Sequence, residues 1–163
     1  MAKVLVFDFG ASSARAIIVE TDGNNLKTEE IHRFPNNPIT VGDTLYWDID
    51  TLLDEVKTAV QKADGYGFEA VSVDTWGVDF VLLDENDQVL GNTVGYRDER
   101  TQGMDEEVYK IIPEKELYAR TGIQKAMYNT IYQLMALKTQ NPEYLEKADA
   151  MLMIPDFFHY KLS

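Results

Sequence analysis

The feature that most constrains the fold is an apolar run, Val4–Phe9, that carries Asp8 and leads directly into Gly10. Two serines and Arg15 follow, and a second apolar run occupies residues 16–19. Short apolar runs around a Gly-containing turn predict a β-hairpin. Its turn gathers backbone N–H groups, hydroxyls and one carboxylate at a single point. Phosphate binds such donors, and Mg²⁺ binds such a carboxylate.

The first half of the chain predicts an α/β sheet that begins with antiparallel strands. The expected strands are Lys3–Phe9, Ala14–Glu20 and Leu26–Phe34, because turn residues separate these apolar segments. Helical spacing of apolar residues then predicts a helix over 49–63, capped by Asp48 or Asp50. A strand at Ala70–Asp74 follows this crossover, so we expect it to run parallel to its neighbour.

The second half is more irregular. Residues 78–83 and 88–90 indicate another hairpin, and Thr130 with Gln133 fits a capping box that opens a helix ending near 139. The remaining expected elements are helices over 101–110 and 113–119, a core strand over 150–154, and a helix over 155–162 that begins with Pro155.

Composition excludes several classes of function. The formal net charge is −13, which disfavours nucleic acid as a partner, and the absence of cysteine excludes disulfides and thiolate sites. The sequence contains no signal-like segment and no apolar run long enough to cross a membrane, so we expect a cytoplasmic protein. His32 and His159 lack metal-site spacing, and no nucleophile, histidine and acid can be grouped as a catalytic triad.

Two further motifs favour a polyol ligand. At the end of the expected fourth strand, Asp74, Trp76 and Gly77 supply a hydroxyl acceptor, a flat apolar face and close backbone access, where open α/β sheets bind ligands. The alternative is that Trp76 is core and Gly77 a bend. The motif Tyr96–Arg100 offers Arg97 and Asp98 to hydroxyls or phosphate; the alternative is an ion-paired loop exposed to solvent. For the hairpin the alternative is an ordinary glycine turn, since it is neither a Walker A loop nor a Rossmann fingerprint.

Together these segments resemble the FGGY family of carbohydrate kinases, and within it the rhamnulokinase group. The resemblance spans nearly the whole chain and rests on six segments: 8–15, 31–34, 47–50, 74–84, 96–98 and 155–158. It implies the ribonuclease H-like, actin-like ATPase fold, with a mixed sheet and helices on both faces. Residues 1–163 would be the N-terminal, sugar-binding domain, incomplete and without its C-terminal domain.

The resemblance also implies an activity and a set of site residues. The reaction would be phosphorylation of L-rhamnulose at its 1-hydroxyl by Mg·ATP. Asp8 would face the metal, directly or through water, and Gly77 would contact the sugar, with Asp74, Trp76, Arg97 and Asp98 as further candidates. The ATP contacts would be Ala11, Ser12, Ser13, Ala14 and Arg15. Ala14 stands where the family commonly has glycine, which restricts its φ.

By the same resemblance, the catalytic aspartate lies in a segment beyond residue 163. The chain alone is then expected to be inactive, with the remainder of its own polypeptide as its partner. Three alternatives remain open at this point: a kinase for another deoxyketose such as L-fuculose, an actin-like ATPase switch, and a non-catalytic sugar- or nucleotide-binding module. A few side chains that recognise one hydroxyl group would separate the two sugars.

Overall fold

The computed structural model describes residues 1–163, and the chain divides into two compact units. Unit 1 contains the N-terminal strands and the last helix, and unit 2 contains most of the shorter helices. Each unit is described by itself. Unit 1 comprises Met1–Ile39, Trp47–Gly77 and Met153–Ser163; unit 2 comprises Thr40–Tyr46 and Val78–Leu152.

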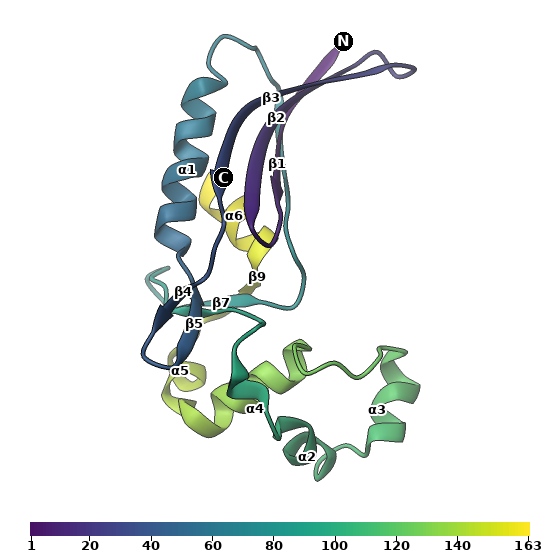
Figure 1. The fold of residues 1–163 in the computed structure, drawn as a ribbon, viewed down its shortest axis with the longest axis vertical. Helices are drawn as coiled ribbons and strands as arrows, with labels where there is room; N and C mark the ends of the chain where they lie inside the picture. The colour runs from purple at the N-terminus through teal and green to yellow at the C-terminus, as the bar shows by residue number, and fades with distance from the viewer. The chain divides into compact units, whose positions relative to one another are not determined.

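Unit 1 is built on a four-stranded mixed sheet in the order β3-β2-β1-β6 (Figure 1). Strand β1 (Ala2–Phe9) pairs antiparallel with β2 (Ser13–Thr21), which pairs antiparallel with β3 (Leu26–Pro35). Strand β6 (Ala70–Asp74) pairs parallel with β1. The predicted antiparallel start and the parallel fourth strand are therefore confirmed.

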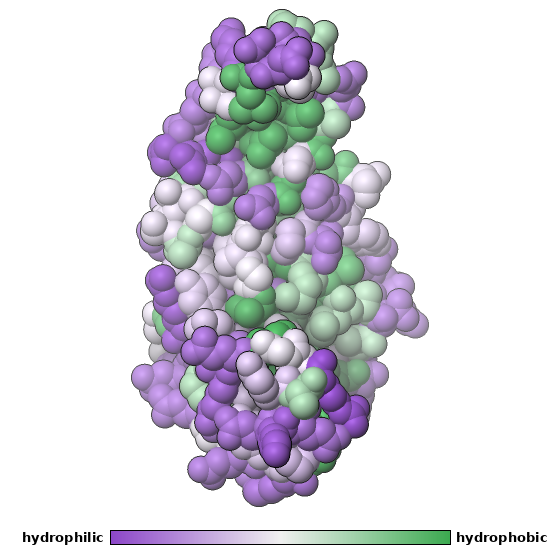
Figure 2. Space-filling model, turned by 90° about the vertical axis from the view of Figure 1, so that its right-hand side faces the viewer, coloured by the Kyte–Doolittle hydropathy of each residue, from purple (hydrophilic) through white to green (hydrophobic).

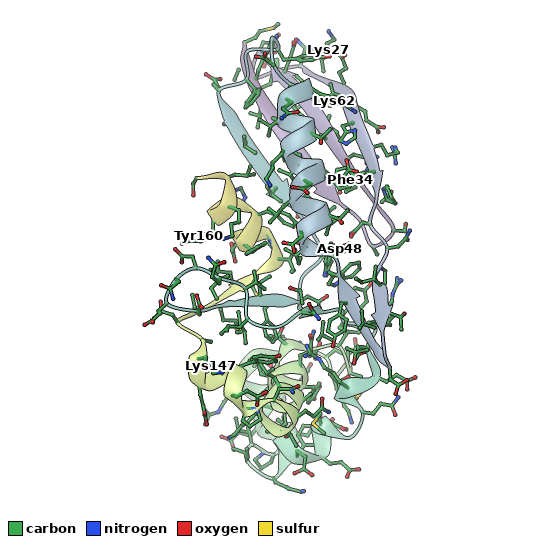
Figure 3. All side chains as sticks on the ribbon, turned by 90° about the vertical axis from the view of Figure 1, so that its left-hand side faces the viewer. Lys27, Phe34, Asp48, Lys62, Lys147 and Tyr160 are labelled. Atoms are coloured by element: carbon green, nitrogen blue, oxygen red, sulfur yellow. The ribbon has the colours of Figure 1, made fainter.

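One face of this sheet carries both helices of the unit, α1 (Ile49–Lys62) and α6 (Ile154–Leu162). On this face the Phe9 ring stacks on Phe158 of α6 at 4.6 Å and meets the edge of Phe34 at 5.7 Å. His32, two residues before Phe34 and so on the same face, lies 2.6 Å from Glu55 of α1. Figure 3 shows α1 in front of the strands, with Asp48 at its start and Lys62 near its end. Asp48 caps the helix as predicted, by accepting from the N–H of Thr51.

The opposite face of the sheet, called the open face below, carries no helix of unit 1. Val4, Val6, Ile17 and Val19 point to it and are only half-buried, because strand side chains alternate between the two faces. Figure 2, viewed from the side away from α1, shows hydrophobic side chains gathered over these strands. The expected mixed α/β fold is confirmed, and both helices of unit 1 lie on one face of the sheet, whereas we expected helices on both faces.

Unit 2 consists of short helices and two small sheets. One sheet has the order β4-β5-β8 and the other pairs β7 with β9. The strands are β4 (Ile39–Val41), β5 (Thr44–Trp47), β7 (Phe80–Leu83), β8 (Thr93–Val94) and β9 (Ala150–Met153). The helices are the 3₁₀ turn η1 (Glu99–Thr101), α2 (Met104–Tyr109), α3 (Glu114–Thr121), α4 (Thr130–Gln140) and α5 (Pro142–Lys147).

Several predictions for this unit were wrong in detail. The helix expected over 101–110 is split at Gly103, whose φ of 76° interrupts helical geometry. Strand β9 is half-exposed and is not core. The capping box is also wrong, because Asn129 occupies the N-cap of α4 and makes no side-chain cap bond. The side chains of Thr130 and Gln133 bind the carbonyl of Val78 instead.

No helix in the structure has the length and apolar character that crossing a membrane requires.

Candidate functional site

The turn between β1 and β2 is a tight loop with unused hydrogen-bond donors. The N–H of Gly10 donates to the carbonyl of Ser13 at 2.9 Å, and a Cβ at Gly10 would lie 3.0 Å from that oxygen. The N–H groups of Ala11 and Ser12 and the hydroxyls of Ser12 and Ser13 make no hydrogen bond within the chain. Ser12 is exposed, so these donors are open to an anion from solvent.

Asn36, which sequence reasoning missed, holds this turn in place. Its side-chain amide donates to the carbonyl of Gly10 at 2.6 Å, and its backbone N–H donates to the carbonyl of Ser12 at 3.1 Å. The residue is 2% exposed, although it lies in the polar loop after β3. A buried asparagine satisfied by backbone carbonyls fixes a loop conformation. The only sequence signal was its position in the segment 35–38, which predicts a loop and nothing more.

Three charged residues form a row beside this turn. Asp8 of β1 and Arg15 of β2 are cross-strand partners and form an ion pair. Asp74 of β6 is the register partner of Asp8 on the other side, so all three side chains point to the open face of the sheet. Two neighbouring carboxylates beside free N–H donors suit a divalent cation that itself carries phosphate. No group of three or more His, Asp or Glu residues forms a complete metal site, so a metal here would also need ligands from the nucleotide or water.

Ala14 differs from the other residues proposed for ATP. It is completely buried, on the face of the sheet that carries the helices, between its register partners Phe9 and Phe34. Its small side chain allows those aromatic rings to pack. The structure thus gives Ala14 a packing role, whereas Ala11, Ser12 and Ser13 border the open turn.

The end of β6 presents the second predicted motif. Asp74 is exposed, and the half-buried Trp76 ring packs against Trp47 with ring centres 4.2 Å apart. Gly77 is exposed, its φ is not left-handed, and a Cβ there would meet no atom within 4 Å. Nothing in the fold therefore requires glycine at position 77. The chain does bend at Gly77, as expected, and the bend continues through Val78, whose φ of 79° costs a β-branched residue about 1–3 kcal/mol.

The third predicted motif lies in unit 2 and divides into two kinds of residue. Asp98 is 8% exposed, and its carboxylate accepts from the backbone N–H groups of Leu45 and Arg100, each at 2.8 Å. Both oxygens of Asp98 are bound to backbone N–H groups. The alternative of an ion-paired loop exposed to solvent is therefore wrong for this residue. Arg97 is exposed and lies over the Tyr96 ring at 5.3 Å. Burial lowers the pKa of the neighbouring Arg100 guanidinium, while Asp98 and Asp79 oppose that shift.

Unit 2 also contains a cavity of about 520 Å³ next to α3 and the start of α4. Its size lies within the range of small-molecule sites. The lining includes Val78, Asn129, Thr130, Tyr109 and Tyr132. The hydroxyls of these two tyrosines are 2.9 Å apart, and burial together with this bond raises the pKa of Tyr132 to about 12. The predicted residues Asp74, Trp76 and Gly77 belong to unit 1, whereas Arg97 and Asp98 belong to unit 2.

Comparison with known proteins identifies the class. The sequence model of the FGGY family of carbohydrate kinases, N-terminal domain, matches residues 3–163. Solved structures agree with this at the level of fold. A gluconate kinase from Lactobacillus acidophilus superimposes with a TM-score of 0.80 over 98% of this chain and 33% of its own, at 18% identity. A xylulose kinase from Rhodospirillum rubrum gives 0.80 over 98% and 34%, at 16% identity. The chain belongs to the FGGY family of carbohydrate kinases and has the fold of the N-terminal part of these sugar kinases.

Relatives with higher sequence identity are found within one group of the family, the rhamnulokinases. The chain is 47% identical to the rhamnulokinase of Oceanobacillus iheyensis and 48% identical to that of Halalkalibacterium halodurans, over 98% of its own length in both cases. It is 37% identical to the rhamnulokinase of Mannheimia succiniciproducens. The chain spans 34% of the length of each of these relatives.

Proposed function

We propose that this chain is the N-terminal, sugar-binding part of a longer enzyme that phosphorylates L-rhamnulose at O1 with Mg·ATP. The observation that carries this proposal is the 47–48% identity to rhamnulokinases over 98% of the chain. The residues of the hairpin and of the end of β6 supply the chemistry that such a reaction needs. A cytoplasmic location is part of the proposal, because the phosphate donor is ATP.

The hairpin would bind the phosphates. The free N–H groups of Ala11 and Ser12, together with the serine hydroxyls, supply donors for phosphate oxygens. Arg15 adds a positive charge, and its ion pair with Asp8 orients that carboxylate on the open face. Bound Mg²⁺ would neutralise charge on the transferred phosphoryl group. Asp8 would hold the metal directly or through water, with Asp74 beside it.

The end of β6 would form one wall of the sugar site. Gly77 gives a hydroxyl-rich ligand access to the backbone, because no atom outside residues 76–78 lies within 4 Å of the position of a Cβ. Trp76 is braced by Trp47 and can offer an apolar surface to the carbon skeleton. Arg97, exposed on unit 2, stays a candidate for hydroxyl recognition. We propose no sugar contact for Asp98, because both of its oxygens are used within the chain.

The base that takes the proton of the 1-hydroxyl is proposed to lie outside these 163 residues. Asp74 and Asp79 are not assigned that role. Asp79 is completely buried and accepts from the backbone N–H of Tyr96 and from Gln133. Asp74 lies beside Asp8 in the row of charged residues on the open face.

The test is ADP release with Mg·ATP and a panel of ketoses, measured for the longer protein that contains this chain and for residues 1–163 alone. The proposal predicts turnover with L-rhamnulose by the longer protein only. Preference for L-fuculose would move the assignment to another deoxyketose kinase. ATP turnover that is indifferent to sugar would favour a nucleotide switch, and the absence of turnover in both forms would favour a binding module.

A further inference from the structure

Val78 holds a backbone conformation that its side chain disfavours. Its φ is 79°, whereas a valine in a strand or helix has a negative φ of about −60 to −160°. Most positive-φ residues in this chain are glycines, and Asp87 is the only other exception. Val78 follows the exposed Gly77 and borders the cavity of unit 2. Strain of this kind persists only where the surroundings impose it, and it is concentrated at functional sites.

Two side chains of α4 bind the carbonyl of Val78. The hydroxyl of Thr130 donates to the carbonyl of Val78 at 2.8 Å, and the amide nitrogen of Gln133 donates to the same oxygen at 3.3 Å. These are the side chains that a capping box would have used for the helix itself. Helix α4 thus begins without a side-chain cap while both groups hold a backbone carbonyl 52 or more residues earlier in the chain.

The amide of Gln133 has one possible orientation. Its nitrogen faces three acceptors, which are the carbonyls of Val78 and Tyr128 and the carboxylate of Asp79 at 2.9 Å. Its oxygen accepts from the Arg100 guanidinium at 2.8 Å. A flipped amide would set its oxygen against three acceptors and its nitrogen against a cation. Gln133 is 1% exposed, so these bonds are shielded from bulk water.

Asp79 fixes the other side of the same peptide segment. It is completely buried; one carboxylate oxygen accepts from Gln133, and the other accepts from the backbone N–H of Tyr96 at 3.1 Å. A buried carboxylate must keep such donors, because leaving it without them is costly. The backbone on the C-terminal side of Val78 is therefore held at two points, the carbonyl of Val78 and the carboxylate of Asp79. With that side fixed, the φ of Val78 determines the direction of the Gly77–Val78 peptide.

We propose that Thr130 and Gln133 are positioning residues for sugar binding. They keep Val78 left-handed, so that the Gly77–Val78 peptide presents its polar groups to the acceptor sugar in one orientation. This inference rests on the proposed sugar site at Gly77. A purely structural network would affect stability alone, whereas a positioning network also affects sugar binding.

The test is steady-state kinetics of the longer enzyme, with L-rhamnulose and ATP varied separately. Gln133→Met removes the amide and keeps the approximate volume, and we expect it to raise the KM for sugar about tenfold or more, with the KM for ATP within about twofold. Thr130→Val is expected to raise the sugar KM about fivefold, and Thr130→Ser, which keeps the hydroxyl, to restore it. Gln140→Met and Thr139→Val make the same chemical changes on the exposed end of α4 and serve as controls.

A second-site variant separates positioning from general stability. Val78→Gly removes the steric cost of the left-handed conformation. The double variant Val78→Gly/Gln133→Met should therefore have a sugar KM at least about fivefold lower than that of Gln133→Met alone. Thr130→Val keeps the inference testable if Gln133→Met fails to fold, as judged by circular dichroism. Suppose that the wild type is active. If both α4 variants then leave the sugar KM unchanged, or change it together with the KM for ATP, this inference alone is overturned. A wild type without sugar-dependent turnover overturns the proposed function and this inference together.

Discussion

The side-chain amide of Asn36 donates to the main-chain carbonyl of Gly10 across 2.6 Å, which ties the loop after β3 to the turn between β1 and β2. The turn itself is closed by only one backbone bond, between Gly10 and Ser13. Asn36, a residue outside the turn, maintains the shape of the turn. The remaining donors of the turn are therefore free for a ligand. The proposed phosphate site thus depends on a third segment of unit 1.

We expect Asn36→Ala to lower the free energy of unfolding by about 1 kcal/mol, because it removes the bond that a buried side chain donates to the carbonyl of Gly10. In the longer enzyme the KM for ATP should rise several-fold, while the KM for sugar stays near its wild-type value. Denaturant unfolding and steady-state kinetics measure the two effects. Asn37→Ala, at an exposed neighbouring position, is the control. An unchanged KM for ATP in a destabilised Asn36→Ala enzyme would contradict the role given to this anchor.

Two glycine substitutions should have opposite consequences. Gly77→Ala adds a Cβ in open space, so stability should change by less than about 0.5 kcal/mol while the KM for sugar rises about tenfold or more. Gly10→Ala places its Cβ 3.0 Å from the backbone oxygen of Ser13 and should destabilise the protein by about 1–3 kcal/mol. Thermal unfolding and sugar titration distinguish them. A Gly77→Ala enzyme with wild-type kinetics would remove Gly77 from the sugar site.

Asp8→Asn should lower kcat about 100-fold and raise the Mg²⁺ concentration needed for half-maximal rate, because the neutral amide is a weaker metal ligand. The fold should survive, since an ion pair as exposed as Asp8 with Arg15 contributes little to stability. Glu20→Gln removes a carboxylate that pairs with Lys3 on the same sheet and serves as the control. Equal losses in the two variants would show a general effect of charge and contradict a metal role for Asp8.

The turn between β2 and β3 should be sensitive to acid. The backbone N–H groups of Asn25 and Asn24 bind the carboxylate of Asp22 and lower its pKa from 3.8 to about 2. The folded state therefore favours the ionised form. Its contribution to stability is fully present above pH 3.8 and is lost as the pH falls through about 2. A titration of the Asp22 carboxyl carbon by NMR should give a midpoint near 2, and a midpoint near 3.8 would contradict these turn bonds.

Much of unit 1 was predictable because its signals are local. Strands β1 to β3 and helix α1 begin and end within about two residues of the prediction, since their apolar periodicity and turn residues agree. The same reasoning missed the short strands β4, β5 and β8, which are two to four residues long and leave almost no periodic pattern.

The polar contacts of the site were less predictable, because they join distant segments. Thr130 and Gln133 have capping-box spacing, yet their partners lie at Val78 and Asp79, far away in the chain. Asp98 resembled part of a solvated charge run, but tertiary contacts with Leu45 bury it. Sequence spacing indicates which side chains can act locally, and it carries no direct signal for partners more than 50 residues apart.

The central claim is tested most directly by identifying the product that the longer enzyme forms from L-rhamnulose and Mg·ATP. Phosphorus–proton NMR of the reaction mixture should show a new phosphate ester coupled to the two methylene protons of C1, formed in equal amount with ADP. Inorganic phosphate as the only new phosphorus species, or an ester at another carbon, would contradict the account.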